Sequence, residues 1–162
     1  IRYQEGVQQV LLNGEDVSGL IRTEEVGNMA SAVSGYMPVR EKLVELQKQL
    51  AAKENVIMDG RDIGTCVLPD APAKIYLTAS VEVRAVRRYK ELLEKGMEAD
   101  LKEIEKDIED RDYRDMHREH SPLKQAEDAV LLDTSSMTLD QVVEEILKIV
   151  REKGYKAAGG CA

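Results

Sequence analysis

The chain has 162 residues, a formal net charge of −8 and 43% hydrophobic residues, which is enough for one soluble globular domain with its own core. The acidic balance argues against a general nucleic-acid binder, and no apolar run approaches the roughly 18 residues that span a membrane. The two cysteines, Cys66 and Cys161, lie in unrelated contexts. We therefore expect no disulfide and a reducing, cytoplasmic setting.

The first part of the chain predicts short extended segments followed by two helices. Residues 1–12 have an extended pattern, and Asn13-Gly14 is a turn signal. Thr23 can cap a first helix. Pro38 suits the first turn of a second helix, in which apolar residues repeat at helical spacing from residue 39 to residue 52.

An apolar run at residues 55–58 is too short for a helix and predicts a buried parallel strand. Asp59, Arg61 and Asp62 follow it immediately, with two glycines that allow a tight turn. Ligands of open α/β sheets bind beyond the carboxyl ends of the strands, and a guanidinium there suits phosphate. The alternative is a capped turn with a local Arg–Asp ion pair.

Two further short strands are predicted at residues 73–77 and 128–133. Amphipathic helices are predicted between and after them, at residues 81–93, 100–120 and 138–153. Short buried strands that alternate with such helices indicate an α/β fold, with a parallel sheet and helices on its faces.

Arginine is concentrated in one segment, because six of the eleven arginines fall between Arg84 and Arg118. Arg111, Asp115 and Arg118 are spaced four and three residues apart and would share one helical face. That face is either a ridge of surface ion pairs, each worth ~0.3–0.5 kcal/mol, or a lid that closes on a phosphate. His117 and His120 have no partner at a spacing typical of a metal site, so we expect a surface role.

Four segments together resemble bacterial cytidylate kinase, in matching order and spacing over nearly the whole chain. They are residues 13–17 with 21–26, residues 59–65, residues 69–80 and residues 111–115. The resemblance implies the P-loop nucleoside-monophosphate kinase fold, with an N-terminal antiparallel substrate-binding insertion and a helical lid. It also implies transfer of the γ-phosphoryl group from ATP to CMP or dCMP with Mg²⁺. We expect a monomer without nucleic-acid or membrane partners.

The same resemblance suggests a division of the chain. The insertion is residues 1–37 in part, the α/β core is residues 38–98 and 122–156, the Arg-rich lid is residues 99–121, and residues 157–162 form a tail. The phosphate-binding sequence Gly-x-x-x-x-Gly-Lys-Ser/Thr does not occur in the 162 residues. We therefore expect the chain to be the carboxy-terminal part of a longer kinase, and to be inactive alone.

The resemblance also assigns substrate roles residue by residue. The positions that would read the cytosine ring are Ser31, Arg40 and Asp62. Arg61 and Arg118 match phosphate-binding arginines, and Arg111 and Asp115 match the pair that holds the sugar. The arginines expected to act in catalysis are therefore Arg61, Arg111 and Arg118.

Further roles concern the ATP side. Asp59 matches the acidic residue that steadies Mg²⁺ through water, and the arginines that would face ATP are Arg84, Arg87 and Arg88. Two alternatives stay open. One is a non-catalytic nucleotide-binding module that retains the CMP site; the other is a helical interaction domain whose Arg–Asp face is a solvated ridge.

Overall fold

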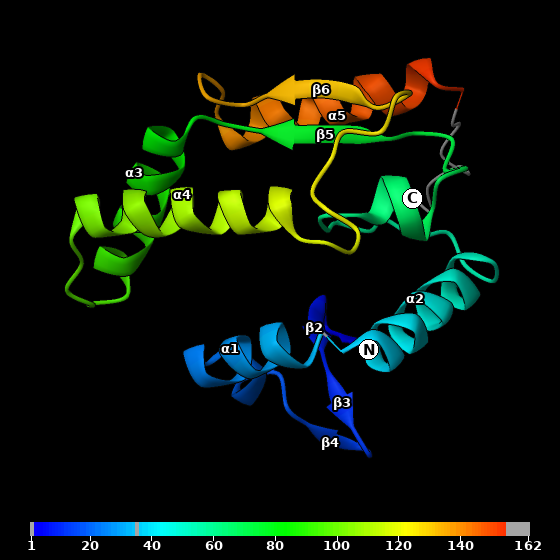
Figure 1. The fold of residues 1–162 in the computed structure, drawn as a ribbon, viewed down its shortest axis with the longest axis horizontal. Coiled ribbons are helices and arrows are strands. Elements are labelled where there is room, and N and C mark those ends of the chain that lie inside the picture. Colours follow the sequence, from blue (N-terminus) through cyan, green and yellow to red (C-terminus); the bar gives the residue numbers. More distant parts are fainter. Residues whose placement is uncertain (1, 35, 155–162) are drawn as a thin grey trace. The chain divides into compact units, whose positions relative to one another are not determined.

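The computed structural model describes residues 2–34 and 36–154, apart from the side chains of Glu24, Asn28 and Ser31 (Figure 1). The chain forms two compact units, Ile1–Val56 and Ile57–Ala162. The helix predicted at residues 39–52 belongs to the first unit. The predicted division, in which residues 38–98 belong to the core, stays a prediction.

The first unit begins with two antiparallel hairpins. Strand β1 (Arg2–Gln4) pairs with β2 (Val7–Gln9), and β3 (Leu11–Leu12) pairs with β4 (Glu15–Asp16). The second hairpin turns at Asn13 and Gly14, whose φ angles are 53° and 92°. Both angles are left-handed, which Asn-Gly adopts readily, so the predicted turn is confirmed.

Three helices follow in this unit: η1 (Leu20–Arg22), α1 (Glu24–Val33) and α2 (Met37–Ala51). The amide of Val26 donates to the Thr23 hydroxyl at 3.4 Å, and Pro38 lies in the first turn of α2, so both predicted helix starts are confirmed. The apolar side of α2 is exposed, and none of the described residues of the unit is buried. Local capping and turn signals therefore define these elements more than core packing does.

The second unit contains a parallel pair of strands, β5 (Ile75–Thr78) and β6 (Val130–Asp133). Their register runs from Ile75 opposite Val130 to Thr78 opposite Asp133. Figure 1 shows the two arrows side by side, pointing the same way. The pair confirms a mixed α/β architecture with a parallel sheet.

The predicted strand at residues 55–58 is wrong for the described structure. The segment is not paired with any described strand, and the side chain of Ile57 is fully exposed. A short apolar segment forms a β-strand only when an adjacent strand pairs with its backbone N–H and C=O groups. β5 and β6 satisfy each other, whereas this segment has no such neighbour in the described part of the chain.

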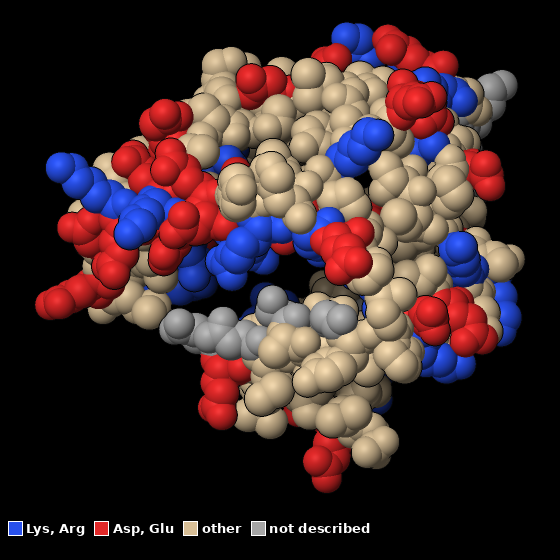
Figure 2. All heavy atoms as spheres, viewed as in Figure 1, with Lys and Arg blue, Asp and Glu red and all other residues tan. Residues whose placement is uncertain are grey.

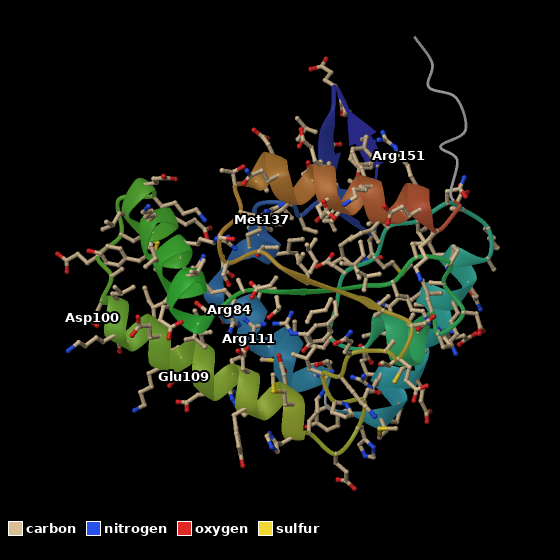
Figure 3. All side chains as sticks on the ribbon, turned by 90° about the horizontal axis from the view of Figure 1, so that it is seen from above. Arg84, Asp100, Glu109, Arg111, Met137 and Arg151 are labelled. Carbon is tan, nitrogen blue, oxygen red and sulfur yellow. The ribbon has the colours of Figure 1, made fainter. Side chains whose placement is uncertain are left out.

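Helices α3 (Val81–Glu94), α4 (Leu101–His117) and α5 (Leu139–Glu152) complete the unit. Ser80, Asp100 and Thr138 cap their first turns, so these helices begin at or next to the residues where the sequence predicted their starts. Figures 1 and 3 both show α5 along one side of the strand pair and α3 beside α4. The buried core residues are Val67, Ala79, Ala85, Leu132 and Ile149.

No helix in the described residues combines the length and the apolar character needed to cross a membrane. Helix α4 ends one residue before Arg118, whose backbone is extended at φ −65° and ψ 145°. The prediction that Arg118 shares a helical face with Arg111 and Asp115 is therefore wrong. The chain reverses just beyond, at Ser121, whose φ of 48° is left-handed.

Candidate functional site

The polar segment at residues 59–62 leads directly into a single π-helical turn, η2 (Ile63–Val67). The Asp62 carbonyl accepts from the amides of Thr65, Cys66 and Val67, at 3.3, 2.8 and 3.3 Å. A Cβ atom at Gly60 would come within 2.8 Å of the Ile63 side chain, so a larger residue there would displace Ile63. The backbone that carries Arg61 and Asp62 is thus held by its own turn.

Arg61 joins this segment to α4. Its Nε donates to Asp115 Oδ2 at 2.9 Å, with the two side chains 42% and 20% exposed. The partner lies 54 residues further along the chain, so the ion pair is not the local one that the alternative interpretation of this segment proposed. It brings together two residues that the sequence predicted for one site.

The loop after α4 returns to the same place. The amide of Leu123 donates to the Asp115 carbonyl at 2.8 Å, and Arg118 Nε donates to the Ser121 carbonyl at 2.7 Å. Arg118 therefore lies in a loop that folds back onto the end of α4. Arg111 is exposed on α4 and forms no hydrogen bond or ion pair with the described residues.

Arg84 and Arg87 are engaged with the carboxyl ends of the two strands. Arg84 Nε donates to the Ala79 carbonyl at 3.0 Å, directly after β5. Its two terminal nitrogens donate to the Asp112 carboxylate at 3.0 and 2.5 Å. This hydrogen bonding to Asp112 raises the pKa of Arg84 above its ordinary value.

Arg87 fastens the end of β6 to α3. Its guanidinium donates to the Thr134 hydroxyl at 3.2 Å and to the Thr134 carbonyl at 2.6 Å. Thr134 is only 4% exposed, and its hydroxyl donates in turn to the Thr78 carbonyl at 3.0 Å. Arg88 makes an exposed pair with Glu91 at 2.9 Å within α3. The predicted contact of these three arginines with ATP stays a prediction.

Lys74 forms a further ion pair, directly before the start of β5. Its side chain is 8% exposed, and its Nζ lies 2.7 Å from Asp128 and also donates to the Pro69 carbonyl. The hydrogen bond from Lys74 lowers the pKa of Asp128 below its ordinary value of 3.8. This pair holds the chain before β6 against the start of β5.

Asp59 was predicted to act toward Mg²⁺ through water. It is exposed and has no hydrogen bond or ion pair within the described chain. Among the described residues, no group of three or more His, Cys, Asp or Glu side chains could hold a metal ion. A lone carboxylate fits Mg²⁺ that keeps its waters and binds nucleotide phosphates, and it does not fit a metal held by protein ligands alone.

Ser31 and Arg40, the other two predicted cytosine readers, belong to the unit Ile1–Val56. Ser31 lies in α1, but its side chain is outside the described part of the structure. Arg40 is half-buried in α2, and its amide donates to the Tyr36 carbonyl at 3.0 Å. Their role toward a base stays a prediction.

The sequence interpretation missed two residues that organise the second unit, Asp112 and Thr134. Asp112 is one of several acidic residues on α4, and its spacing alone does not distinguish it from the exposed ones. Thr134 directly follows a predicted strand. Buried backbone carbonyls at such a position need hydrogen-bond donors, and a threonine hydroxyl can provide one. Only that position could have been singled out from the sequence.

Comparisons with known proteins agree along most of the chain. The sequence model of a family described as cytidylate kinase matches residues 1–152. A cytidylate kinase of Lactobacillus johnsonii is 55% identical over 152 residues, which cover 94% of this chain and 66% of that protein. Those of Listeria innocua and Streptococcus pneumoniae are 51% and 53% identical, over 94% and 90% of this chain and 69% and 65% of theirs. The chain thus spans about two thirds of the length of these relatives.

Proposed function

Because the chain belongs to the cytidylate kinase family, we propose that it carries the CMP-binding part of a kinase that transfers the γ-phosphoryl group of ATP to CMP or dCMP. The observation that carries the proposal is the ion pair between Arg61 and Asp115 at 2.9 Å. It places the polar segment after residue 58 against the end of α4, with Arg111 on the same helix and Arg118 in the loop that returns to it.

The substrate roles follow from the chemistry of these side chains. Arg61 and Arg118 would bind the phosphate, for which a guanidinium fork is well suited. Arg111 and Asp115 would hold the sugar, because a carboxylate accepts hydrogen bonds from ribose or deoxyribose hydroxyls. The Asp62 carboxylate would accept from the exocyclic amino group of cytosine. The same role toward the base is proposed for Ser31 and Arg40 on the strength of the sequence resemblance.

Phosphoryl transfer between two nucleotides needs no covalent enzyme intermediate and no strong base. The protein must bring two anions together and neutralise charge on the transferring group. Arg61, Arg111 and Arg118 would supply positive charge from the segment before η2, from α4 and from the loop after α4. Mg²⁺ bound with ATP would neutralise phosphate charge, with Asp59 as the residue that would hold its water ligands.

The architecture proposed for the whole chain is that of a P-loop nucleoside-monophosphate kinase. The antiparallel hairpins β1–β2 and β3–β4 support an N-terminal substrate-binding insertion at residues 1–37. Helix α4, whose outer surface is almost wholly polar, supports a lid at residues 99–121. Figure 2 shows acidic and basic side chains gathered over α3 and α4.

Calorimetry with CMP tests the proposed site. We expect the chain to bind CMP more tightly than AMP, and Asp62→Asn to weaken CMP binding by roughly 10- to 100-fold, because a hydrogen bond to a charged group contributes about 1.5–3 kcal/mol. Arg61→Met should weaken binding similarly. The matched control is Arg151→Met, because Arg151 is exposed on α5 and lies well apart from Arg111 (Figure 3). Absence of CMP binding, or equal losses in the control, would contradict the proposal.

A second experiment concerns catalysis. We propose that the 162 residues alone do not transfer a phosphoryl group, because they contain no Gly-x-x-x-x-Gly-Lys-Ser/Thr sequence to hold ATP phosphates. A coupled assay of ADP release with CMP and Mg-ATP measures this. Turnover well above background by the chain would refute it, while CMP binding remains an independent measurement.

A further inference from the structure

The Arg84 guanidinium ties three elements of the second unit together. Nε is bonded to the carbonyl of Ala79 at the end of β5, and the two terminal nitrogens hold both oxygens of Asp112 on α4. All three nitrogens of the guanidinium therefore donate hydrogen bonds to protein oxygens. Such a bidentate, charge-assisted pair fixes orientation as well as distance. The two side chains are 34% and 25% exposed, so water has only partial access to the pair.

The position of this pair along the helices matters. Helices α3 and α4 are joined by residues 95–100, where Gly96, with a φ of 72°, ends α3. Arg84 lies in the first turn of α3, ten residues and about 15 Å before its end, and Asp112 lies about 17 Å beyond the start of α4. The Arg84–Asp112 ion pair thus joins α3 and α4 far from the connecting loop, near their other ends.

Asp112 is also close to the proposed substrate residues. It directly follows Arg111 and precedes Asp115 by three residues, a rise of about 4.5 Å along the helix. Asp115 in turn receives Arg61 at 2.9 Å. A rotation of α4 about its axis, or a swing about the loop, would move Arg111 and Asp115 together away from Arg61.

We propose that Arg84 and Asp112 are positioning residues that fix α4 against the carboxyl end of β5, so that Arg111 and Asp115 are presented to Arg61. The part of this inference that concerns nucleotide rests on the proposed function. The connecting loop holds α4 at one end only, and the Arg84–Asp112 pair supplies a second point of attachment, to α3 and the end of β5. Because Ala79 is 7% exposed and directly follows a paired strand, that point is anchored to the sheet.

The isosteric variant Asp112→Asn tests the inference, because it removes the charge and one acceptor while keeping the shape. Its matched control is Asp107→Asn, the same change at an exposed residue of α4 without a hydrogen bond or ion pair in the described chain. The first readout is the Nε–H resonance of Arg61 in ¹⁵N NMR, assigned with Arg61→Lys. We expect Asp112→Asn to shift it to the position that it takes in Asp115→Asn, and Asp107→Asn to leave it unchanged.

The second readout is CMP affinity by calorimetry, for which we expect a roughly tenfold loss in Asp112→Asn, since small misplacements of binding groups are costly. Asp112→Glu keeps the charge, and partial recovery of CMP affinity in this variant would support a positioning role.

Hydrogen exchange of the β5 and β6 amides reports whether a variant is folded. If Asp112→Asn unfolds, Arg84→Lys is used in its place. A folded variant in which the Arg61 resonance is unchanged overturns the inference. If the unaltered chain binds no CMP, the proposed function fails, and the NMR readout still decides the positioning role.

Discussion

Arg61 and Asp115 are 54 residues apart in the sequence and are joined by an ion pair of 2.9 Å between the segment before η2 and helix α4. The same two side chains are those to which we assign the phosphate and the sugar of CMP. Arg61 Nε and Asp115 Oδ2 are bonded to each other. We therefore expect a nucleotide to compete with Asp115 for Arg61.

The first prediction is that Asp115→Asn has opposite effects on two ligands. Affinity for inorganic phosphate should rise by up to about fivefold, because Arg61 is released from an exposed ion pair worth ~0–1 kcal/mol. Affinity for CMP should fall, because the acceptor for the sugar hydroxyls is weakened. Calorimetry with each ligand measures both effects.

Asp70→Asn is the control for that experiment, since Asp70 is exposed in a loop and has no hydrogen bond or ion pair in the described chain. It should leave both affinities unchanged. A parallel fall in the affinities for phosphate and CMP would show that Asp115 does not compete for Arg61.

The second prediction concerns the buried hydroxyl of Thr134. Thr134→Val keeps the shape of the side chain but removes the acceptor for Arg87 and the donor to the Thr78 carbonyl. We expect the free energy of unfolding to fall by about 1–3 kcal/mol, the cost of leaving buried polar groups unsatisfied. Urea denaturation measures it. Ser136→Ala, at an exposed serine of the same loop, should change stability by less than about 0.5 kcal/mol.

The third prediction compares two aliphatic side chains at opposite extremes of burial. Val67 is 2% exposed, whereas Ile57 is fully exposed. Val67→Ala should lower the free energy of unfolding by roughly 2 kcal/mol, because it removes two buried methyl groups and leaves a cavity. Ile57→Ala should have almost no effect. Comparable losses in the two variants, measured in urea, would mean that residues 55–58 are buried in solution.

The fourth prediction is a pH dependence that arises from Lys74 and Asp128. The hydrogen bond from Lys74 lowers the pKa of the folded Asp128 carboxyl below its ordinary value of 3.8. A lowered folded pKa stabilises the protein above the ordinary value, and this contribution is lost as the pH falls through the folded pKa. The stability difference between the unaltered chain and Asp128→Asn should therefore be constant above about pH 5 and shrink below it.

Urea denaturation from pH 7 to pH 2.5 in both proteins measures this difference. Asp70→Asn again serves as the control, and its difference from the unaltered chain should not follow the same profile. A difference for Asp128→Asn that persists unchanged to the lowest pH would exclude Lys74 as a significant partner.

Local elements were predictable wherever the signal is carried by adjacent residues. Thr23 caps a helix as predicted, the helices that follow Ser80 and Thr138 begin where their starts were predicted, and Asn13-Gly14 forms its hairpin turn. The prediction of a strand at residues 55–58 was wrong, because the composition suits a strand but strand formation also needs a neighbouring strand to pair with. The end of α4 was placed too late because residues 118–121 are polar and carry no clear stop signal before Pro122.

The sequence by itself determined the α/β class, the helix starts, the concentration of arginines and the family resemblance, because each depends on composition, spacing or adjacent residues. Only the tertiary structure decided the partner of each charge. Arg61 pairs with Asp115 and Arg84 with Asp112, whereas Arg111 stays unpaired within the described chain. Side chains on one acidic, arginine-rich helix are nearly equivalent in sequence, and they become different only when folding brings distant segments against some of them.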